Sequence, residues 1–248
     1  MGAIVIIPAR YASTRLPGKP LLDRTGKPLI QHVVEAVRPA RCVESVVVAT
    51  DDQRIAAAVT AFGGEVVMTS ADCRSGTDRL AQAADLMALG DDAVVVNVQC
   101  DEPEMAPQHV DRLVDLLERS KADMATLASP LPAGQASDPN RVKVVLDRQG
   151  YALYFSRSPI PFDRDGAAPA GYLLHLGIYA YRVGFLARYA AMAPTPAEQA
   201  EKLEQLRALE HGHRIAVGVV DHYAAGIDTP ADYEAFVARC ARGQQRSP

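Results

Sequence analysis

Short runs of apolar, often β-branched residues alternate with longer segments of mixed polarity along the first half of the chain. The short runs predict buried strands at residues 3–7, 45–50, 65–69 and 93–98. We expect the first strand to stop at Pro8, which has no backbone N–H. Between the strands, apolar residues recur at helical spacing over residues 27–38, 54–62 and 107–119, and in a helix that buries Leu80, Ala83, Ala84 and Met87. Strand–helix–strand units in this order indicate an α/β fold with a parallel sheet and right-handed crossovers.

The pattern changes after a further predicted strand at residues 124–129. Residues 129–140 are rich in Pro, Gly, Ser and Asp, which is typical of a loop and indicates a subdomain boundary. Beyond it we predict a hairpin, a Tyr-rich strand, a long charged helix, a last strand and a final helix, at residues 141–147 with 151–156, 172–182, 196–210, 214–220 and 231–242. We therefore expect a single domain over residues 1–248, with a hairpin insertion around residues 130–195.

The composition is that of an ordinary globular protein, with 48% hydrophobic and 23% charged residues. A net charge of −4 argues against a general nucleic-acid binder, which usually carries a basic excess. No stretch approaches the roughly 20 apolar residues of a membrane span, and charge and Pro interrupt the first apolar run before it resembles a signal peptide. Four cysteines are scattered without C-x-x-C spacing, so we expect reduced thiols in a cytoplasmic protein without membrane insertion.

A basic loop follows the first predicted strand. It carries Arg10, Arg15 and Lys19, spaced by small residues and by Pro17 and Gly18. Open α/β sheets bind ligands beyond the carboxyl ends of their strands, and three cations beside accessible backbone N–H groups suit a triphosphate. The alternative is a solvated surface loop, but the position straight after a buried strand favours anion binding. The Gly-x-x-x-x-Gly-Lys-[Ser/Thr] phosphate loop is absent from the sequence.

Acidic residues follow the fourth predicted strand and precede the last helix. Asp101 and Glu102 stand just beyond the strand, which is the usual place for a Mg²⁺ ligand, although the pair could also form a turn at a helix start. We favour the metal for Asp101. Asp228 precedes Thr229 and Pro230, so it either caps the following helix or supplies a second metal carboxylate beside Asp101. The sequence leaves both roles open.

Three further groups of polar residues are candidates for function. Residues 75–79 read as a helix start that Thr77 is placed to cap, and a helix N-terminus there would also suit a polar ligand. Arg157 follows the hairpin in an extended, Pro-rich segment and could grip a carboxylate bidentately. His175 is a lone histidine in an apolar strand, which by itself favours a structural role.

Seven motifs along the chain resemble those of one enzyme family. They are IIPARYASTRLPGKPL, SGTDR, NVQ-x-DEP, YFSRSPIP, HLGIYAYR, EKLEQLRALEHG and GIDTPADYE. Their order and content resemble the 3-deoxy-manno-octulosonate cytidylyltransferases, also called CMP-Kdo synthetases, from residue 4 to about residue 234. The first motif alone would indicate only the wider nucleotidyltransferase class.

The resemblance implies a fold and a reaction. The fold would be three-layer α/β, with a mostly parallel mixed sheet of the nucleotide-diphospho-sugar transferase (Rossmann-like) type and a small dimerising insertion. The reaction would be the Mg²⁺-dependent transfer of CMP from CTP to the anomeric hydroxyl of 3-deoxy-manno-octulosonate (Kdo), with release of pyrophosphate. Members of the family usually work as cytoplasmic homodimers that supply lipopolysaccharide synthesis.

The resemblance also implies roles for individual residues. Arg10, Arg15 and Lys19 would hold the triphosphate and, with Asp101, act in catalysis. Asp101 and Asp228 would bind Mg²⁺. The residues against the nucleoside would be Ser75, Gly76, Thr77, Asp78 and Arg79, with Asp101 close by. The residues around the sugar acid would be Gln99, Arg157, His175, Tyr179 and either Glu204 or Glu210.

One position departs from the family pattern. The family has Gly where this chain has Cys100, and Gly often marks a positive φ or a close approach of the backbone to a ligand. We expect Cys100 to crowd the metal site or shift Asp101, so that CTP affinity or rate changes while activity survives. Two other functions stay open: a cytidylyltransferase for another sugar acid, such as a sialic acid or 8-amino-Kdo, and a nucleotide-binding relative without catalysis.

Overall fold

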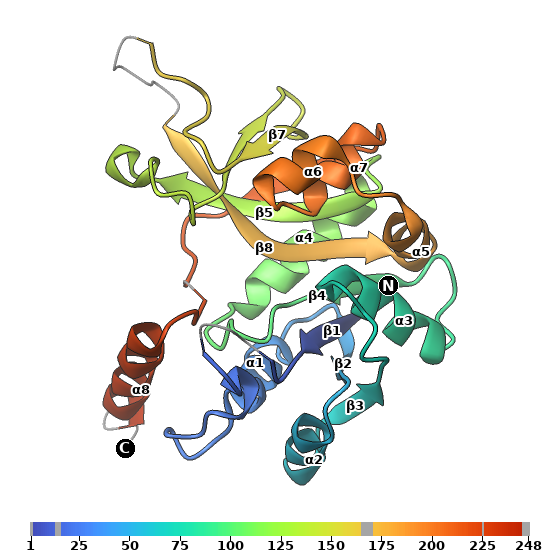
Figure 1. The fold of residues 1–248 in the computed structure, drawn as a ribbon, viewed down its shortest axis with the longest axis vertical. Helices are drawn as coiled ribbons and strands as arrows, with labels where there is room; N and C mark the ends of the chain where they lie inside the picture. The colour runs from blue at the N-terminus through green and yellow to red at the C-terminus, as the bar shows by residue number, and fades with distance from the viewer. Residues whose placement is uncertain (1, 13–15, 165–170, 225, 245–248) are drawn as a thin grey trace. The chain divides into compact units, whose positions relative to one another are not determined.

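The computed structural model describes residues 2–12, 16–164, 171–224 and 226–244 of the chain (Figure 1). Its internal contacts divide the chain into two compact units. Unit 1 comprises Met1–Leu89, Asn97–Val110 and Ala224–Pro248, and unit 2 comprises Gly90–Val96 and Asp111–Tyr223. The predicted insertion around residues 130–195 lies within unit 2.

Unit 1 is built on parallel strands, as the apolar runs predict. Strand β1 (Ala3–Ala9) pairs in parallel with β2 (Val43–Thr50), and β2 pairs in parallel with β3 (Glu65–Met68). The expected stop at Pro8 is wrong, because β1 runs through Pro8, opposite Ala49, to Ala9. A proline removes one donor but keeps φ within the extended range, so a strand can tolerate it close to its end.

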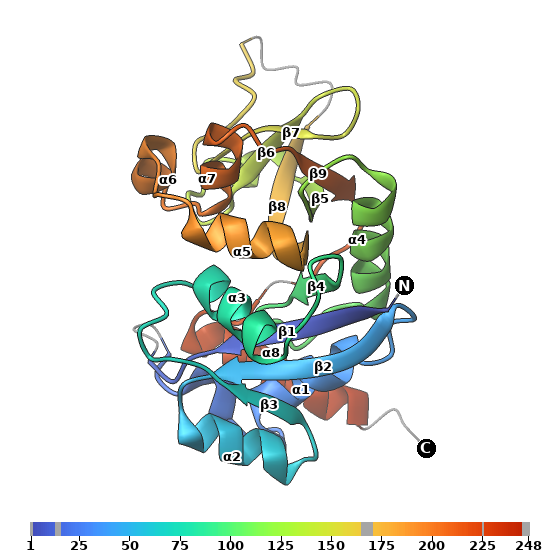
Figure 2. The same ribbon diagram turned by 90° about the vertical axis from the view of Figure 1, so that its right-hand side faces the viewer.

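Helices cover both faces of the unit 1 strands (Figure 2). Helices α1 (Leu29–Val37) and α2 (Gln53–Ala61) lie on one face and α3 (Gly76–Leu86) on the other. The parallel connections β1–α1–β2 and β2–α2–β3 run in the same direction across the sheet, so right-handed crossovers place α1 and α2 on the same face. A short 3₁₀ helix, η1 (Lys19–Leu21), precedes α1.

The end of the chain returns to unit 1 as α8 (Pro230–Gln244). A buried cluster of Leu16, Leu29, Ile227, Tyr233 and Phe236 joins this helix and the segment before it to α1 and the basic loop. Burial of apolar surface is favourable, by about 25 cal/mol per Å². The cluster therefore stabilises the position of residues 226–229 beside the amino-terminal segment.

Unit 2 contains a mixed sheet. Its strands lie in the order β4 (Val94–Asn97), β8 (Tyr172–Arg182), β5 (Met124–Leu131) and β9 (Ile215–Val219). Strand β5 pairs antiparallel with β8 and parallel with β9. The predicted hairpin is present as β6 (Lys143–Leu146) and β7 (Ala152–Ser156). Helix α4 (Pro107–Arg119) also follows the prediction, and a 3₁₀ turn, η2 (Ala133–Gln135), follows β5.

Two helical segments of unit 2 differ from the prediction. Helix α5 (Val183–Ala191) was not predicted, although Phe185, Leu186 and Tyr189 give it a buried face at helical spacing. The single long helix predicted over 196–210 is wrong: the segment forms α6 (Pro196–Glu201) and α7 (Gln205–Glu210), and Lys202 between them has a φ of 53°. Leucines spaced every three residues drift around a 3.6-residue turn, so they do not require one continuous helix.

In the part of the chain that the structure describes, no helix is long and apolar enough to cross a membrane.

Candidate functional site

Three residues from distant parts of the sequence meet in unit 1. Lys19 Nζ lies 2.7 Å from Asp101 Oδ2 and 3.3 Å from Asp228 Oδ1. The turn before Lys19 depends on Gly18, whose φ of 67° lies in the left-handed region and whose N–H donates to the Tyr11 carbonyl. Lys19 and the two aspartates are therefore adjacent, whereas Arg10 contacts the loop before α3 and Arg15 lies outside the described residues.

The backbone holds the two aspartates together independently of their side chains. The Ile227 N–H donates to the Asp101 carbonyl at 2.8 Å, and the Ile227 side chain is fully buried. A Cβ at Gly226 would lie 3.4 Å from the Asp101 carbonyl oxygen, an ordinary van der Waals contact, so the close approach does not require glycine. The main-chain contact thus fixes the loop after β4 against the loop before α8.

The structure shows the contacts of Asp228 and the cap of the helix that follows it. Helix α8 is capped by Thr229 and Asp232: the Asp232 N–H donates to Thr229 Oγ1, and the Asp232 carboxylate accepts from the Thr229 N–H at 2.8 Å. The Asp228 N–H donates to the same carboxylate. Thr229 and Asp232 therefore cap the helix. The Asp228 carboxylate contacts the Lys19 ammonium.

Lys19 is cationic in this site. Burial acts to lower its pKa, but the charge and hydrogen bond of Asp101 and the charge of Asp228 outweigh burial and raise the pKa above its ordinary value. Lys19 therefore carries a positive charge at neutral pH.

The cluster fits a divalent cation that shares its ligands with a substrate. An ammonium already bridges the two carboxylates, which shows that both can address one cation. Among the described residues, no group of three or more His, Cys, Asp or Glu side chains could hold a metal ion without further ligands. Mg²⁺ is usually bound by one or two carboxylates, with phosphate oxygens and waters completing its shell.

Arg10 contacts the loop that leads into α3. Its Nη2 donates to the carbonyls of Cys73 at 2.7 Å and Ser75 at 2.8 Å, and its Nη1 donates to the Arg74 carbonyl. The guanidinium predicted to hold a triphosphate therefore positions the segment predicted to lie against the nucleoside.

Helix α3 begins at that segment. Ser75 caps it, accepting from the Asp78 N–H at 3.1 Å, so the expected cap by Thr77 is wrong. Ser75 has the extended backbone of a cap residue, whereas Thr77 already lies inside the helix and is buried. Gly76 and the following N–H groups thus form a helix start, the arrangement that favours anions and polar ligands.

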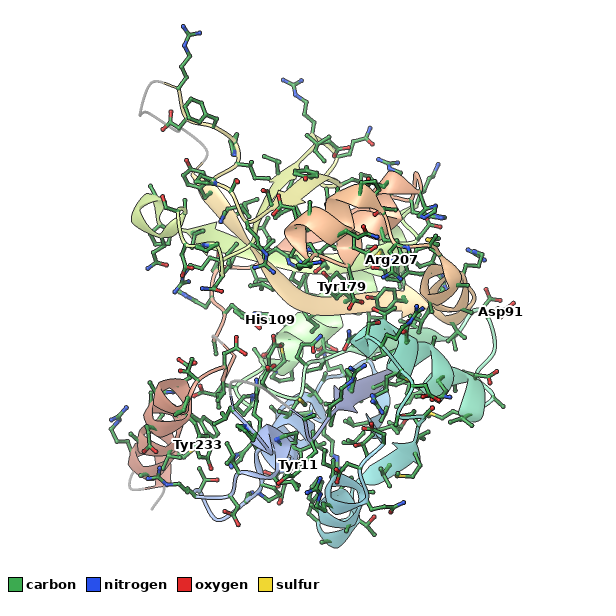
Figure 3. All side chains as sticks on the ribbon, in the orientation of Figure 1. Tyr11, Asp91, His109, Tyr179, Arg207 and Tyr233 are labelled. Atoms are coloured by element: carbon green, nitrogen blue, oxygen red, sulfur yellow. The ribbon has the colours of Figure 1, made fainter. Side chains whose placement is uncertain are left out.

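A cavity of about 320 Å³ opens beside Arg10 within unit 1. Its floor includes Arg79, whose fully buried guanidinium pairs with Asp51 at 3.2 Å and donates to Thr69 Oγ1. Arg54 lies over the ring of Tyr11, labelled in Figure 3, at 3.3 Å from its centroid. The cavity size is that of a small-molecule site. The lining residues are Arg10, Tyr11, Ala12, Asp51, Asp52, Arg54, Ala71 and Arg79.

Cys100 needs no glycine-like backbone. Among the residues that the structure describes, only Ala88 and Lys202 combine a side chain with a positive φ. Burial, helped by the charge of Asp101, raises the pKa of the Cys100 thiol to about 12. The thiol is therefore neutral at physiological pH.

The predicted sugar-acid residues are divided between the two units. Gln99 lies in unit 1, where its carbonyl accepts from the Glu102 N–H and closes the turn that carries Asp101. The others, which lie in unit 2, are Arg157, His175, Tyr179, Glu204 and Glu210.

Arg157 joins three segments of unit 2. Its guanidinium donates to the carbonyls of Glu201 at 2.7 Å, Pro139 at 2.8 Å and Lys202 at 3.4 Å. The bonds to Glu201 and Lys202 satisfy carbonyl groups at the break between α6 and α7. The sequence analysis missed Glu201, whose carboxylate accepts from Ser156 Oγ and from the Arg157 N–H at 2.9 Å. A glutamate at a helix end carries no sequence signal for these contacts.

The two glutamate candidates have different local contacts. The Glu210 carboxylate accepts from the N–H groups of Ala197 and Glu198 at the start of α6. Glu204 stands at the start of α7, and its carbonyl accepts from the Tyr189 hydroxyl at 2.6 Å. Glu210 thus stabilises a helix start, and its predicted sugar contact would compete with that bond.

His175 lies among aromatic rings on β8. Its ring is 4.9 Å from that of Phe155 and 5.4 Å from that of Tyr179, which Figure 3 labels. His175 Nε2 is 3.2 Å from Thr126 Oγ1, which also reaches the carbonyls of Leu176 and Ile178. Because carbonyls only accept, the threonine hydroxyl donates to them and accepts from Nε2–H, which makes Nδ1 the acceptor nitrogen.

We expect His175 to stay neutral from pH 5 to pH 8. Desolvation lowers the pKa of the ring to about 3, against an ordinary value near 6.5. The unfolded chain then binds more protons than the folded protein between these two values, so His175 lowers stability as pH falls below about 6.5. Two-dimensional NMR of the histidine rings, with the urea-unfolded protein as reference, would test this. A His175 midpoint near 6.5 in the folded protein would contradict it.

Known proteins resemble this chain along nearly its whole length. A cytidylyltransferase family model matches residues 4–215. The 3-deoxy-manno-octulosonate cytidylyltransferase of Syntrophobacter fumaroxidans is 53% identical over 240 residues, covering 96% of both sequences.

Solved structures agree with these sequence matches. A CMP:2-keto-3-deoxy-manno-octonic acid synthetase complexed with CTP is similar with a TM-score of 0.92 at 45% identity, covering 98% of this chain and 100% of the other. A 4-diphosphocytidyl-2C-methyl-D-erythritol synthase, at 15% identity and a TM-score of 0.65, shares the fold over 96% of this chain and 97% of its own. The predicted three-layer, mostly parallel α/β fold class is confirmed.

Proposed function

The chain belongs to the 3-deoxy-manno-octulosonate cytidylyltransferase family, and on that premise we propose that it transfers CMP from CTP to the anomeric hydroxyl of Kdo, releasing pyrophosphate. The observation that carries the proposal is the meeting of Lys19 with Asp101 and Asp228. A cation and two carboxylates at one point suit the joint binding of a polyphosphate and a divalent ion.

We infer that the divalent ion is Mg²⁺ and that Asp101 and Asp228 hold it. Bound there, it would neutralise phosphate charge and lower the pKa of the attacking hydroxyl. The chain's own part is positioning. The Ile227–Asp101 backbone bond keeps the two carboxylates adjacent, and the bonds of Arg10 keep the segment before α3 in place for the nucleoside.

In the proposed reaction the sugar hydroxyl attacks the α-phosphorus in line with the departing pyrophosphate. Phosphoryl-type transfer needs little covalent work from the protein, so charge stabilisation supplies most of the catalysis. Lys19 is placed to stabilise charge on the leaving group, together with Arg15 as the resemblance implies. Residues 75–79 would lie against the nucleoside, because their helix start supplies backbone N–H groups.

We propose that the candidate residues of unit 2 bind the sugar acid. Support comes from His175, whose neutral ring offers Nδ1 as an acceptor for a sugar hydroxyl. Arg157 would reach the sugar carboxylate only by sharing or giving up bonds to the α6 carbonyls. Glu204 or Glu210 would complete the site.

We also propose a cytoplasmic homodimer that serves lipopolysaccharide synthesis, as in the family. Unit 2 exposes apolar side chains around its hairpin, with Leu153 63% and Phe162 85% accessible, and such side chains suit a subunit contact. Light scattering should give twice the monomer mass. A monomer at micromolar concentration would remove this part of the proposal.

A pyrophosphate-release assay with CTP, Mg²⁺ and Kdo tests the proposed activity. Parallel reactions with ATP, GTP and UTP, and with sialic acid and 8-amino-Kdo, test both specificities. We expect the highest kcat/KM for CTP with Kdo. A higher value for another sugar acid would favour the related cytidylyltransferase, and CTP binding without turnover would indicate a relative that has lost catalysis.

We expect the native protein to be active with Cys100 in place. Cys100→Gly should change kcat or the KM for CTP by less than about tenfold, because the position has no positive φ and the thiol is neutral. Steady-state kinetics of both forms would measure this. A native protein without activity beside an active glycine variant would show that the thiol blocks the site.

A further inference from the structure

We propose that the Lys19 ammonium occupies the cation position between Asp101 and Asp228 in the free protein, so that a divalent ion binds well only when a nucleotide draws Lys19 away. The inference rests on the proposed function, since it concerns the same two carboxylates. It adds an order of events: metal uptake follows or accompanies nucleotide binding.

The geometry places the ammonium and the metal in competition. Lys19 Nζ is within ion-pair distance of an oxygen of each aspartate, at 2.7 Å and 3.3 Å. A Mg²⁺ ion bound to these oxygens would lie about 2 Å from each and would need the same lone pairs. A divalent ion and the Lys19 ammonium that contacted the same oxygens would also repel each other strongly in a half-buried site.

The aspartates do not depend on Lys19 for their positions. The Asp101 carbonyl is held by the Ile227 N–H, and the Asp228 N–H is held by the Asp232 carboxylate. Removing the ammonium should therefore leave the two carboxylates adjacent but without the Lys19 charge. Such a pair attracts a divalent ion more strongly than the pair neutralised by Lys19.

Lys19 is also suited to leave the position. Its charge sits at the end of a four-carbon stem with rotatable bonds, and one of its two partners, Asp228, has a side chain 47% exposed to solvent. An arriving triphosphate offers the ammonium new anionic partners and frees the carboxylates for the metal. Metal and nucleotide are then thermodynamically coupled, each raising the affinity for the other.

Manganese binding without nucleotide tests the proposal. Free Mn²⁺ can be measured by electron paramagnetic resonance during titration of the wild-type protein, Lys19→Met and Lys19→Gln. We expect both variants to bind Mn²⁺ at least about tenfold more tightly than the wild type, since the competing charge is gone. Lys27→Met removes an exposed lysine paired with Glu35 and should match the wild type.

Two further variants locate the effect and keep the test decisive. Adding Asp101→Asn to Lys19→Met should abolish the gain in Mn²⁺ affinity if the gain arises at this site. Circular dichroism shows whether each variant is folded. Mn²⁺ affinity in either folded Lys19 variant that is equal to or weaker than that of the wild type would overturn the proposal.

The test is independent of turnover. A wild-type protein that fails to release pyrophosphate would overturn the proposed function and leave the Mn²⁺ result standing. Conversely, an active wild-type protein whose Lys19 variants gain no Mn²⁺ affinity would overturn only the competition between Lys19 and the metal.

Discussion

Replacing Asp101 with asparagine should lower kcat for pyrophosphate release by roughly 10³-fold, the effect typical of losing one main charge-stabilising group. The amide keeps the size of the carboxylate, and the backbone bond from Ile227 does not involve the side chain. The change therefore removes the charge that pairs with Lys19 and, by our proposal, holds the metal. Initial rates at saturating CTP, Mg²⁺ and Kdo would measure it.

Glu104→Gln is the matched control for this variant. Glu104 stands three residues further along the same loop and pairs with Arg239 on α8 through two carboxylate oxygens. It lies outside the Lys19 cluster, so we expect a kcat within about twofold of the wild type, as for most surface changes. An Asp101→Asn variant with full turnover in Mg²⁺ would refute the role of Asp101.

Replacing Arg207 with methionine should lower the free energy of unfolding by about 3–5 kcal/mol, as breaking a buried ion pair generally does. Arg207, labelled in Figure 3, donates through Nε to Glu198 at 2.9 Å, and both side chains are only about one-tenth exposed. The variant leaves the Glu198 carboxylate buried without its partner. Urea unfolding followed by circular dichroism would measure the loss.

Arg119→Met controls for the loss of an arginine as such. Its ion pair with Asp115 is exposed on α4, and such pairs contribute about 0–1 kcal/mol. We expect the two variants to differ by at least about 2 kcal/mol. Equal losses would show that the Glu198–Arg207 pair has no special role in unit 2.

The same pair makes stability depend on pH. Burial acts to raise the pKa of Glu198, but the hydrogen bonds from Arg207 and the Thr195 N–H hold it below the ordinary value of 4.5. The stabilisation that the ionised Glu198 provides is therefore complete above about pH 4.5. It disappears as pH falls through the lower pKa that Glu198 has in the folded protein. Glu198→Gln should remove this step from the acid-unfolding profile.

The strands and most helices could be predicted because buried elements have apolar residues at a characteristic spacing in the local sequence. Residues 46–49 and 93–96 are continuous apolar runs, as expected for strands covered on both faces. The break at Lys202 could not be predicted, because the Lys202 carbonyl accepts a hydrogen bond from the side chain of Arg157, which is far away in the sequence. Helix α5 was missed although its buried spacing could be seen in the sequence.

The candidate site was predictable where it follows from topology. Lys19 follows the first predicted strand and Asp101 the fourth, and a predicted parallel sheet brings such loops to one edge, so their meeting could be expected. For Asp228 the sequence left a helix cap and a metal carboxylate open, and the resemblance implied the metal. The contacts of Arg10 with the carbonyls of residues 73–75 were not predictable, because any loop supplies carbonyl groups and none is marked in the sequence. Glu201 was missed for the same reason.

The central claim is that the basic loop and the two aspartates bind one nucleotide and its metal ion. A crystal structure of the protein soaked with CTP and Mn²⁺, with the anomalous signal of manganese recorded, tests it most directly. We predict a manganese peak between Asp101 and Asp228 and triphosphate density beside Lys19. A peak away from these carboxylates, or a triphosphate bound elsewhere with Lys19 still paired to both aspartates, would contradict the account.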